Sequence, residues 1–336
     1  MPDLQAFAYF DGRLATELIE VSHDPSVLDG HGWWAVVLTY EGIFTAARFA
    51  RVEAAPFPEA KWLGAPREDW SSSMSREQYV AAVQTVREAI AAGEVYQANI
   101  CRVLTTGISA ECSMSGLGHA LDRHHPAPHA GAVVVESHDL EVVTATPELF
   151  LRRQGSIIES SPIKGTAKTA DGLLDKDAAE NVMIVDLVRN DLGMVCDPGS
   201  ISVPSLLKVE AHPGLVHLVS TVRGELRPEH GWADILAATF PPGSVTGAPK
   251  SSALSIIDEL EPVPRGPYCG AVGWVNADSQ SAQLGVGIRT FWREGSILHF
   301  GTGAGITWGS DPEQEWEETK LKADRLLAVA AEGSDR

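Results

Sequence analysis

The sequence predicts an α+β fold with antiparallel strands. Short runs rich in β-branched residues follow one another between residues 131 and 160, and turns at His138-Asp139 and Gln154-Gly155 separate them. This cadence is typical of an antiparallel meander and not of alternating β-α-β units. Clear helical patterns lie outside the meander, at residues 75–93 and 311–323. No helical pattern therefore interrupts the strands of the meander.

Composition and charge exclude several classes of protein. The chain has 336 residues, of which 44% are apolar, and 26 Lys and Arg stand against 45 Asp and Glu, for a net charge of −19. Such an acidic chain lacks the basic face that nucleic acids and anionic membranes require. The 4 cysteines form no Cys-x-x-Cys pair, which suits a reducing compartment. The start of the chain has no signal-peptide pattern and no apolar run is long enough to span a bilayer, so we expect a cytoplasmic protein.

The chain divides at about residue 70. Residues 1–70 read as short strands and loops that complete a sheet scaffold, and residues 71–330 carry the candidate chemistry. The second part opens with a helix: Ser75 and Gln78 form a capping box, and Gly93 stands where a helix ends.

A strand follows this helix, and Gln97, Asn99 and Cys101 share one of its faces because side chains alternate along a strand. Buried amides need polar partners, and a hydrogen bond across the sheet is the simplest partner for them.

The most chemically loaded stretch runs from Glu159 to Asp191. Lys164 lies in a Pro-Ile-Lys-Gly-Thr turn, and a helix over residues 174–192 then carries Asp177 and Glu180 on one face. A lysine can be a nucleophile when burial and neighbours lower its pKa. The alternative is an ordinary solvated lysine, and the residues alone leave that alternative open.

Two other segments invite a functional interpretation. His217 lies among apolar residues of a strand, where a histidine is more often part of the core. The run Gly243–Lys250 lacks the Gly-Lys-Ser/Thr order of a phosphate-binding loop, because Ala248 and Pro249 separate the glycine from the lysine. We predict a glycine-rich loop that leads into a helix over residues 253–260.

The C-terminal helix carries a second pair of carboxylates. Asp311 and Pro312 are typical of its first residues, and Glu315, Glu318 and Lys322 share one flank. A solvated, ion-paired flank is the simpler interpretation. If this helix converges with the helix of Asp177 and Glu180, however, the four carboxylates would repel one another unless Mg²⁺ lies between them. The metal would also allow an acidic protein to bind an anion.

Ten motifs in order give the chain a resemblance to a known family. They are GEVYQANI, TPELF, PIKGT, DAAENVMIVDLVRND, VHLVS, GSVTGAPK, PYCGAVG, GVGIRT, GTGAGI and DPEQEWEET. Each is weak alone, but the ordered set, between Tyr79 and Ala323, resembles the chorismate-utilising enzymes of the anthranilate synthase component I type. The resemblance implies a four-layer αββα arrangement, with large antiparallel sheets packed face to face and helices outside.

The resemblance also implies a role for each site residue. Glu180 and Glu318 would hold Mg²⁺, with Asp177 and Glu315 supporting it through water. Glu148 would be the general acid and Lys164 the nucleophile. His217 would be a further catalytic residue, and the substrate-binding residues would be Gln97, Thr166, Tyr268, Arg289, Gly303, Ala304, Gly305 and Lys322.

Within the family, Lys164 resembles the mark of the aminodeoxychorismate synthases, which aminate chorismate at C4 and supply 4-aminobenzoate for folate. Anthranilate synthases usually have Ala at this position, and isochorismate and salicylate synthases have a Lys base where this chain has Gln97. The chain has no Gly-x-Cys-x-Gly nucleophile, so a separate glutamine amidotransferase subunit is expected to supply ammonia.

Two alternatives to amination stay open. They are an anthranilate synthase component I and a non-catalytic chorismate-binding subunit. Two departures from the family pattern, Thr146 in place of Ser and Ala178-Ala179 in place of Arg, do not touch the expected chemistry.

Overall fold

A computed structural model describes residues 5–167, 169, 171, 175–212 and 215–333. The helices of this described part are α1 (Arg76–Ala91), α2 (Met114–His124), α3 (Asp175–Gly193), α4 (Trp232–Thr239), α5 (Lys250–Leu260) and α6 (Pro312–Ala331). The strands are β1 (Ala6–Phe10), β2 (Arg13–Ser22), β3 (Trp33–Leu38), β4 (Phe44–Ala54), β5 (Ser71–Ser72), β6 (Gln97–Gly107), β7 (Gly131–Val135), β8 (Leu140–Thr144), β9 (Leu149–Gln154), β10 (Ile157–Ser161), β11 (Ile163–Ala167), β12 (Ser202–His212), β13 (Leu215–Glu225), β14 (Gly247–Ala248), β15 (Ala271–Asn276), β16 (Ser281–Val286), β17 (Thr290–Glu294) and β18 (Ile297–Ile306).

Backbone hydrogen bonds join these strands into one 18-stranded sheet. Neighbouring strands follow the order β6–β18–β17–β8–β7–β1–β2–β4–β3–β15–β16–β9–β10–β13. Strands β11 and β12 both pair with β13, and β5 and β14 pair with β6. Every pair is antiparallel, so the predicted α+β class is confirmed. The two faces that pack together belong to one continuous sheet.

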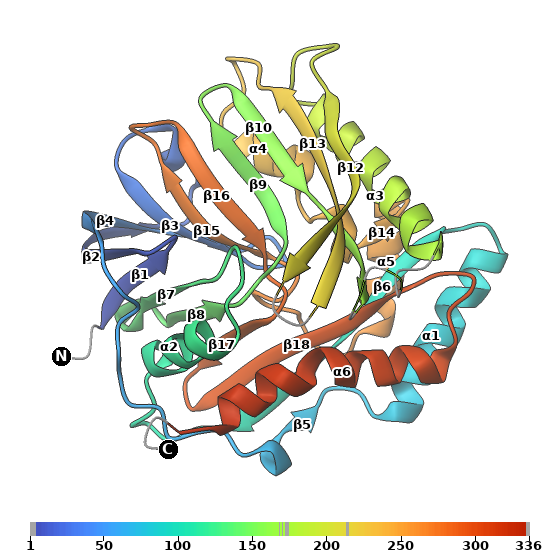
Figure 1. The fold of residues 1–336 in the computed structure, drawn as a ribbon, viewed down its shortest axis with the longest axis horizontal. Helices are drawn as coiled ribbons and strands as arrows, with labels where there is room; N and C mark the ends of the chain where they lie inside the picture. Colours follow the sequence, from blue (N-terminus) through green and yellow to red (C-terminus); the bar gives the residue numbers. More distant parts are fainter. Residues whose placement is uncertain (1–4, 168, 170, 172–174, 213–214, 334–336) are drawn as a thin grey trace.

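The sheet folds back on itself around an apolar core. Val135 of β7, Val36 of β3 and Val272 of β15 belong to the same buried cluster, although β7 lies in one half of the strand order and β15 in the other. Strands β1 and β2 connect the two halves, because β1 pairs with β7 and β2 pairs with β4 (Figure 1). The first strands of the chain thereby join the scaffold that carries the site, and the division at residue 70 stays a prediction.

Helices cover the outer surfaces. Helix α6 runs along β18 and packs with α1 and α2, whereas α3 lies beside β12 and β13 at the other side of the molecule (Figure 1). Apolar side chains of α2 and α6, such as Leu117 and Leu326, form a second core with Phe300. Helix α3 thus contacts β11, and helix α6 contacts β18.

Local sequence signals account for several helix boundaries. The capping box of Ser75 and Gln78 is present at the start of α1, and Asp311 caps α6 by accepting hydrogen bonds from the amides of Glu313 and Gln314. Helix α2 was not predicted. Across the described residues, no helix combines the length and the apolar character needed to cross a membrane.

Candidate active site

Lys164 lies on β11 and points toward the loop before β14. Its Nζ donates a hydrogen bond to the backbone carbonyl of Ser244 at 3.2 Å. The pairing of β11 with β13 shifts register between Lys164 and Thr166, where Gly165 has a φ of +73°. A residue with positive φ at this point favours glycine, so the Lys-Gly pair of the motif is a backbone requirement as well as a chemical one.

Burial lowers the pKa of Lys164 below its ordinary value. Lys322 lowers it further, whereas Glu180, Glu148 and Glu318 raise it. The structure therefore brings side chains from β11, α3, α6 and the loop before β9 into electrostatic contact. A lowered pKa is what a lysine nucleophile requires.

Glu148 is buried next to the same loop. Burial raises the pKa of its carboxyl group, and nearby polar groups of the Ser244 side chain and the Ile163 backbone oppose that rise, as do the charges of Lys164 and Arg289. A carboxyl group whose pKa is raised by burial is suited to general acid catalysis. Lys164 and Glu148 thus have pKa values shifted toward each other.

Gln97 faces Gly305 across the ladder between β6 and β18. A Cβ at Gly305 would lie 2.7 Å from Gln97 Nε2 and 3.4 Å from Lys164 Nζ. Gln97 is fully buried, and among the described residues neither polar atom of its carboxamide has a hydrogen-bond partner. The expected hydrogen bond across the sheet is therefore absent for Gln97, and its buried amide beside Lys164 is open to a water molecule or a ligand. Asn99 does have a partner, because its Nδ2 lies 3.0 Å from Cys101 Sγ.

Helix α6 presents Lys322 and Glu318 to β18. Lys322 Nζ donates to the carbonyl of Gly303 at 3.1 Å and pairs with Glu318 at 2.6 Å. Ala304 is buried and stands opposite Ile100, and Gly303 stands opposite Cys101. The predicted substrate-binding backbone of residues 303–305 therefore lies beside Gln97, Lys164 and Lys322.

The carboxylates suit a Mg²⁺ ion whose remaining ligands are water and substrate. Glu180 of α3 and Glu318 of α6 both act on Lys164, so they face one region. The described residues contain no group of three or more His, Cys, Asp or Glu side chains that could hold a metal alone. Mg²⁺ commonly uses one or two carboxylates with water and an anionic substrate group. The donor set therefore suits Mg²⁺, and its binding stays a prediction.

The supporting carboxylates occupy different surroundings. Glu315 is buried on α6 and accepts a hydrogen bond from Ser310 Oγ at 2.6 Å, which turns it toward the start of the helix. Asp177 is half-buried one turn before Glu180. Their predicted support of Mg²⁺ through water stays a prediction.

His217 lies on β13, directly opposite Thr166 of β11. It is buried, with a relative exposure of 1%. Lys164 pairs with Leu218, so His217 is the neighbour along β13 of the residue that stands opposite Lys164. The side chain of Thr166 lies outside the described part of the chain, so its predicted contact with substrate stays a prediction.

Tyr268 and Arg289 have different neighbours. The ring of Tyr268 covers Gly301, and its hydroxyl lies 3.8 Å from Cys101 Sγ in a buried environment. Arg289 is half-buried, lies 3.5 Å from His125 Nε2 and acts on Glu148. The structure thus brings Arg289 to Glu148 and directs the Tyr268 hydroxyl toward Cys101. A carboxylate shared between Tyr268 and Arg289 stays a prediction.

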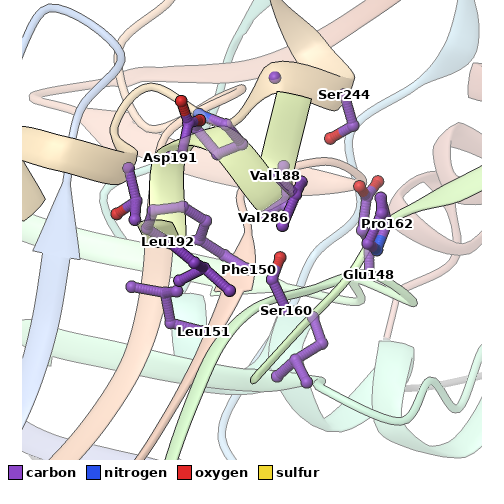
Figure 2. Close-up of a pocket in the computed structure, with 14 residues that line it drawn as sticks. Glu148, Phe150, Leu151, Ser160, Pro162, Val188, Asp191, Leu192, Ser244 and Val286 are labelled. Carbon is purple, nitrogen blue, oxygen red and sulfur yellow. The ribbon is translucent and has the colours of Figure 1, made fainter. Parts of the chain in front are cut away.

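A small cavity lies behind Glu148. Its volume is about 20 Å³, and apolar side chains such as Phe150 and Leu192 line it together with Ser244 and Asp191 (Figure 2). That volume admits about one water molecule. The sequence did not identify Ser244 as a site residue, although it lies inside the GSVTGAPK motif. No pattern in the residues around Ser244 predicts that its carbonyl accepts a hydrogen bond from a lysine 80 residues earlier in the chain.

Comparisons with known proteins agree on the family. Residues 39–328 match the family described as chorismate binding enzyme. The chain is 38% identical over 279 residues to anthranilate synthase component 1 1 of Haloarcula marismortui, covering 80% of this chain and 56% of that protein. It is 34% identical over 354 residues to aminodeoxychorismate synthase component 1 of Escherichia coli, covering 96% and 76%.

A solved structure has the same fold. Anthranilate synthase component I from Streptococcus pneumoniae superposes with a TM-score of 0.80 over 97% of this chain and 93% of that chain, at 21% identity. The motifs, the residues gathered around Lys164 and the match over residues 39–328 lead to one conclusion. The chain belongs to the family of chorismate binding enzymes.

Proposed function

We propose that the protein converts chorismate and ammonia to 4-amino-4-deoxychorismate, as component I of an aminodeoxychorismate synthase. The observation that carries this proposal is the juxtaposition of Lys164 with Glu148 beside the open carboxamide of Gln97. Relatives named aminodeoxychorismate synthase support it. Relatives named anthranilate synthase component 1 support a second candidate, an anthranilate synthase component I. Lys164 argues against that candidate.

The chemistry is a pair of allylic displacements. The lone pair of Lys164 Nζ attacks C2 of the ring, both double bonds of the conjugated diene shift, and the C4–O bond breaks as Glu148 delivers a proton, so that water leaves. Ammonia then attacks C4, both double bonds shift back, and the bond between C2 and Nζ breaks. The ionised Glu148 accepts the proton that the incoming ammonia loses. General acid and base catalysis of this kind needs the shifted pKa values of both residues.

Other residues would neutralise the negative charges of the substrate. Glu180 and Glu318 would hold Mg²⁺, with Asp177 and Glu315 behind them, and the ion would neutralise the ring carboxylate. Arg289, Tyr268 and the amides of residues 303–305 would receive the enolpyruvyl carboxylate. Lys322, Gln97, Thr166 and His217 would complete the pocket.

Ammonia would come from a glutamine amidotransferase subunit. The curated relatives are called component 1, which supports a second component. The proposal therefore includes a two-subunit enzyme that acts on glutamine, and a component I that uses ammonium salts when it is alone.

The test is product identification. The protein is incubated with chorismate, Mg²⁺ and ammonium, and products are identified by mass. We expect 4-amino-4-deoxychorismate, in amounts that fall when Mg²⁺ is chelated. Anthranilate with pyruvate, or isochorismate, would overturn the proposal. Tight binding of chorismate without turnover would identify a binding subunit.

A further inference from the structure

Ser244 contacts both residues that the proposed reaction uses. Its backbone carbonyl accepts a hydrogen bond from Lys164 Nζ at 3.2 Å, and its side chain lies close enough to Glu148 to lower the pKa of that carboxyl group. Ser244 is buried, with a relative exposure of 8%, and it lines the small cavity together with Glu148 (Figure 2). One residue therefore connects an acid on the loop before β9 with an amine on β11.

The loop that carries Ser244 is held from several sides. The short 3-10 turn Gly243–Val245 lies against α3, because a Cβ at Gly243 would come within 2.4 Å of Leu187 Cδ2. Arg265 donates to the carbonyl of Val245 at 2.9 Å. The carbonyl of Thr246 accepts from the amide of Asn99 at 2.7 Å.

A second set of contacts closes the loop where α5 begins. Lys250 Nζ bonds Asp191 Oδ2 of α3 at 2.7 Å and approaches the carbonyl of Thr239 at 3.4 Å. Hydrogen bonds on both sides of Ser244 therefore hold the loop and, with it, the orientation of the Ser244 carbonyl. A group that orients another must itself be held in place.

We propose that Ser244 is a positioning residue, whose hydroxyl holds Glu148 and whose carbonyl holds Lys164 so that acid and nucleophile act on one substrate in the same step. The inference rests on the proposed function and adds to it the group that couples the two residues. Ser244 itself forms no bond with the reacting atoms.

The two contacts have distinct chemical consequences. A neutral amine that donates one N–H to a carbonyl keeps its lone pair, and the fixed N–H limits that lone pair to the two remaining tetrahedral positions. A serine hydroxyl bound to one carboxyl oxygen leaves the other oxygen available to the departing hydroxyl group. Lys164 also experiences Glu180, Glu318 and Lys322, and Glu148 also experiences Arg289. Those charges attract or repel the charged forms of Lys164 and Glu148, whereas Ser244 orients their side chains.

The experiment is a double-mutant cycle between Ser244→Ala and Glu148→Gln, with chorismate consumption as the measured rate. We expect Ser244→Ala to lower kcat roughly ten- to a hundredfold, a part of the effect typical of general acid catalysis, with KM changed less than about threefold. In the Glu148→Gln background the same change should cost little more, because its target is already gone. Ser244→Thr, which keeps the hydroxyl, should restore most of the rate.

Three results would overturn the inference: an unchanged kcat in Ser244→Ala, a change confined to KM, or additive losses in the double variant. Ser244→Cys, a weak donor of similar size, replaces the alanine variant if that variant does not fold. The cycle follows substrate loss and is independent of product identity. If the product is anthranilate, the proposed function fails while the cycle still tests Ser244. If the product is the expected one and the losses add, only the role of Ser244 fails.

Discussion

Ser220 Oγ donates a hydrogen bond to Asn181 Oδ1 at 2.5 Å and thereby joins β13 to α3. The same asparagine donates from Nδ2 to the carbonyl of Leu218 at 3.1 Å, and the serine accepts from the amide of Leu207 at 2.9 Å. Asn181 and Ser220 are both fully buried. Because Asn181 directly follows Glu180, this network determines how far the predicted metal-binding carboxylate stands from the sheet.

Asn181→Ala is expected to destabilise the protein and weaken the site. The variant leaves the carbonyl of Leu218 without its donor, and an unsatisfied buried group costs about 1–3 kcal/mol. The midpoint of thermal unfolding should fall, and KM for chorismate should rise as Glu180 loses its anchor. Asp186→Ala, which removes only an exposed ion pair on the same helix, is the control and should change the free energy of unfolding by less than about 1 kcal/mol. An unfolding midpoint equal in both variants would contradict the prediction.

Lys164→Ala is expected to abolish or reroute amination at C4 while Mg²⁺-dependent binding of chorismate persists. The reason is that the nucleophile is lost, whereas the carboxylates of α3 and α6 stay in place. Mass spectrometry of the products and calorimetric titration with chorismate measure the two effects separately. A variant with unchanged product and rate would remove Lys164 from the mechanism.

Gly305→Ala tests how closely backbone and side chains meet at the site. The new Cβ would lie 2.7 Å from Gln97 Nε2 and 3.4 Å from Lys164 Nζ, so Gln97 must move. We expect kcat/KM to fall at least about tenfold, since a displacement of roughly 1 Å can cost a hundredfold in rate. Gly309→Ala is the matched control, because its Cβ would meet nothing within 4 Å. Equal activities of the two variants would show that Gln97 does not approach the substrate.

Glu148 gives the protein a pH-dependent term in its stability. Burial raises the pKa of this carboxyl from its ordinary value of 4.5, so the folded state holds its proton more tightly than the unfolded state does. That stabilisation is complete below pH 4.5 and is lost as pH rises through the pKa of the folded state.

Glu148→Gln removes this term. The stability of the wild type relative to the variant should therefore fall as pH increases above 4.5, and denaturant titrations at several pH values measure the difference. A pH-independent difference would show that Glu148 has the same pKa in both states.

The buried pair of Glu261 and Arg265 holds the Ser244 loop through the protein interior. Arg265 bonds both carboxylate oxygens of Glu261, at 2.8 and 2.6 Å, and donates to the carbonyls of Val245 and Asn99. Glu261→Gln leaves the guanidinium charge buried and uncompensated, which costs about 3–5 kcal/mol.

Chemical denaturation compares that variant with Glu53→Gln, which loses only the exposed pair with Arg51 and should change stability by less than about 1 kcal/mol. Similar losses in both variants would mean that the buried pair contributes no more than a surface pair.

Signals confined to a few neighbouring residues were reliable. The capping box at Ser75 and the cap at Asp311 form as predicted, because each depends only on a side chain and the amides two or three positions away. The antiparallel pairing also follows from alternating runs and short turns. The ordered motifs identified the family, since ten patterns in register exclude chance more strongly than any one of them does.

Helix α2 shows why other elements could not be predicted. Gly116 and Gly118 lower helix propensity within Met114–His124. The fold requires both glycines, because a Cβ would come within 2.7 Å of the Ala60 carbonyl at Gly116 and within 2.3 Å of the Phe57 ring at Gly118. Tertiary packing against residues earlier in the chain therefore overrides the local preference.

The sequence by itself determined the fold class, the family and the residues that could carry chemistry, because these depend on periodicity, composition and motif order. Only the tertiary structure decided which of those residues meet. Gln97 lost its expected partner across the sheet and faces Gly305 instead, and Ser244 joined Lys164 to Glu148. Such contacts depend on strand register and on a loop clamped by Arg265, and neither is encoded within the few residues around Lys164. The lysine was visible in the sequence, and the group that orients it was not.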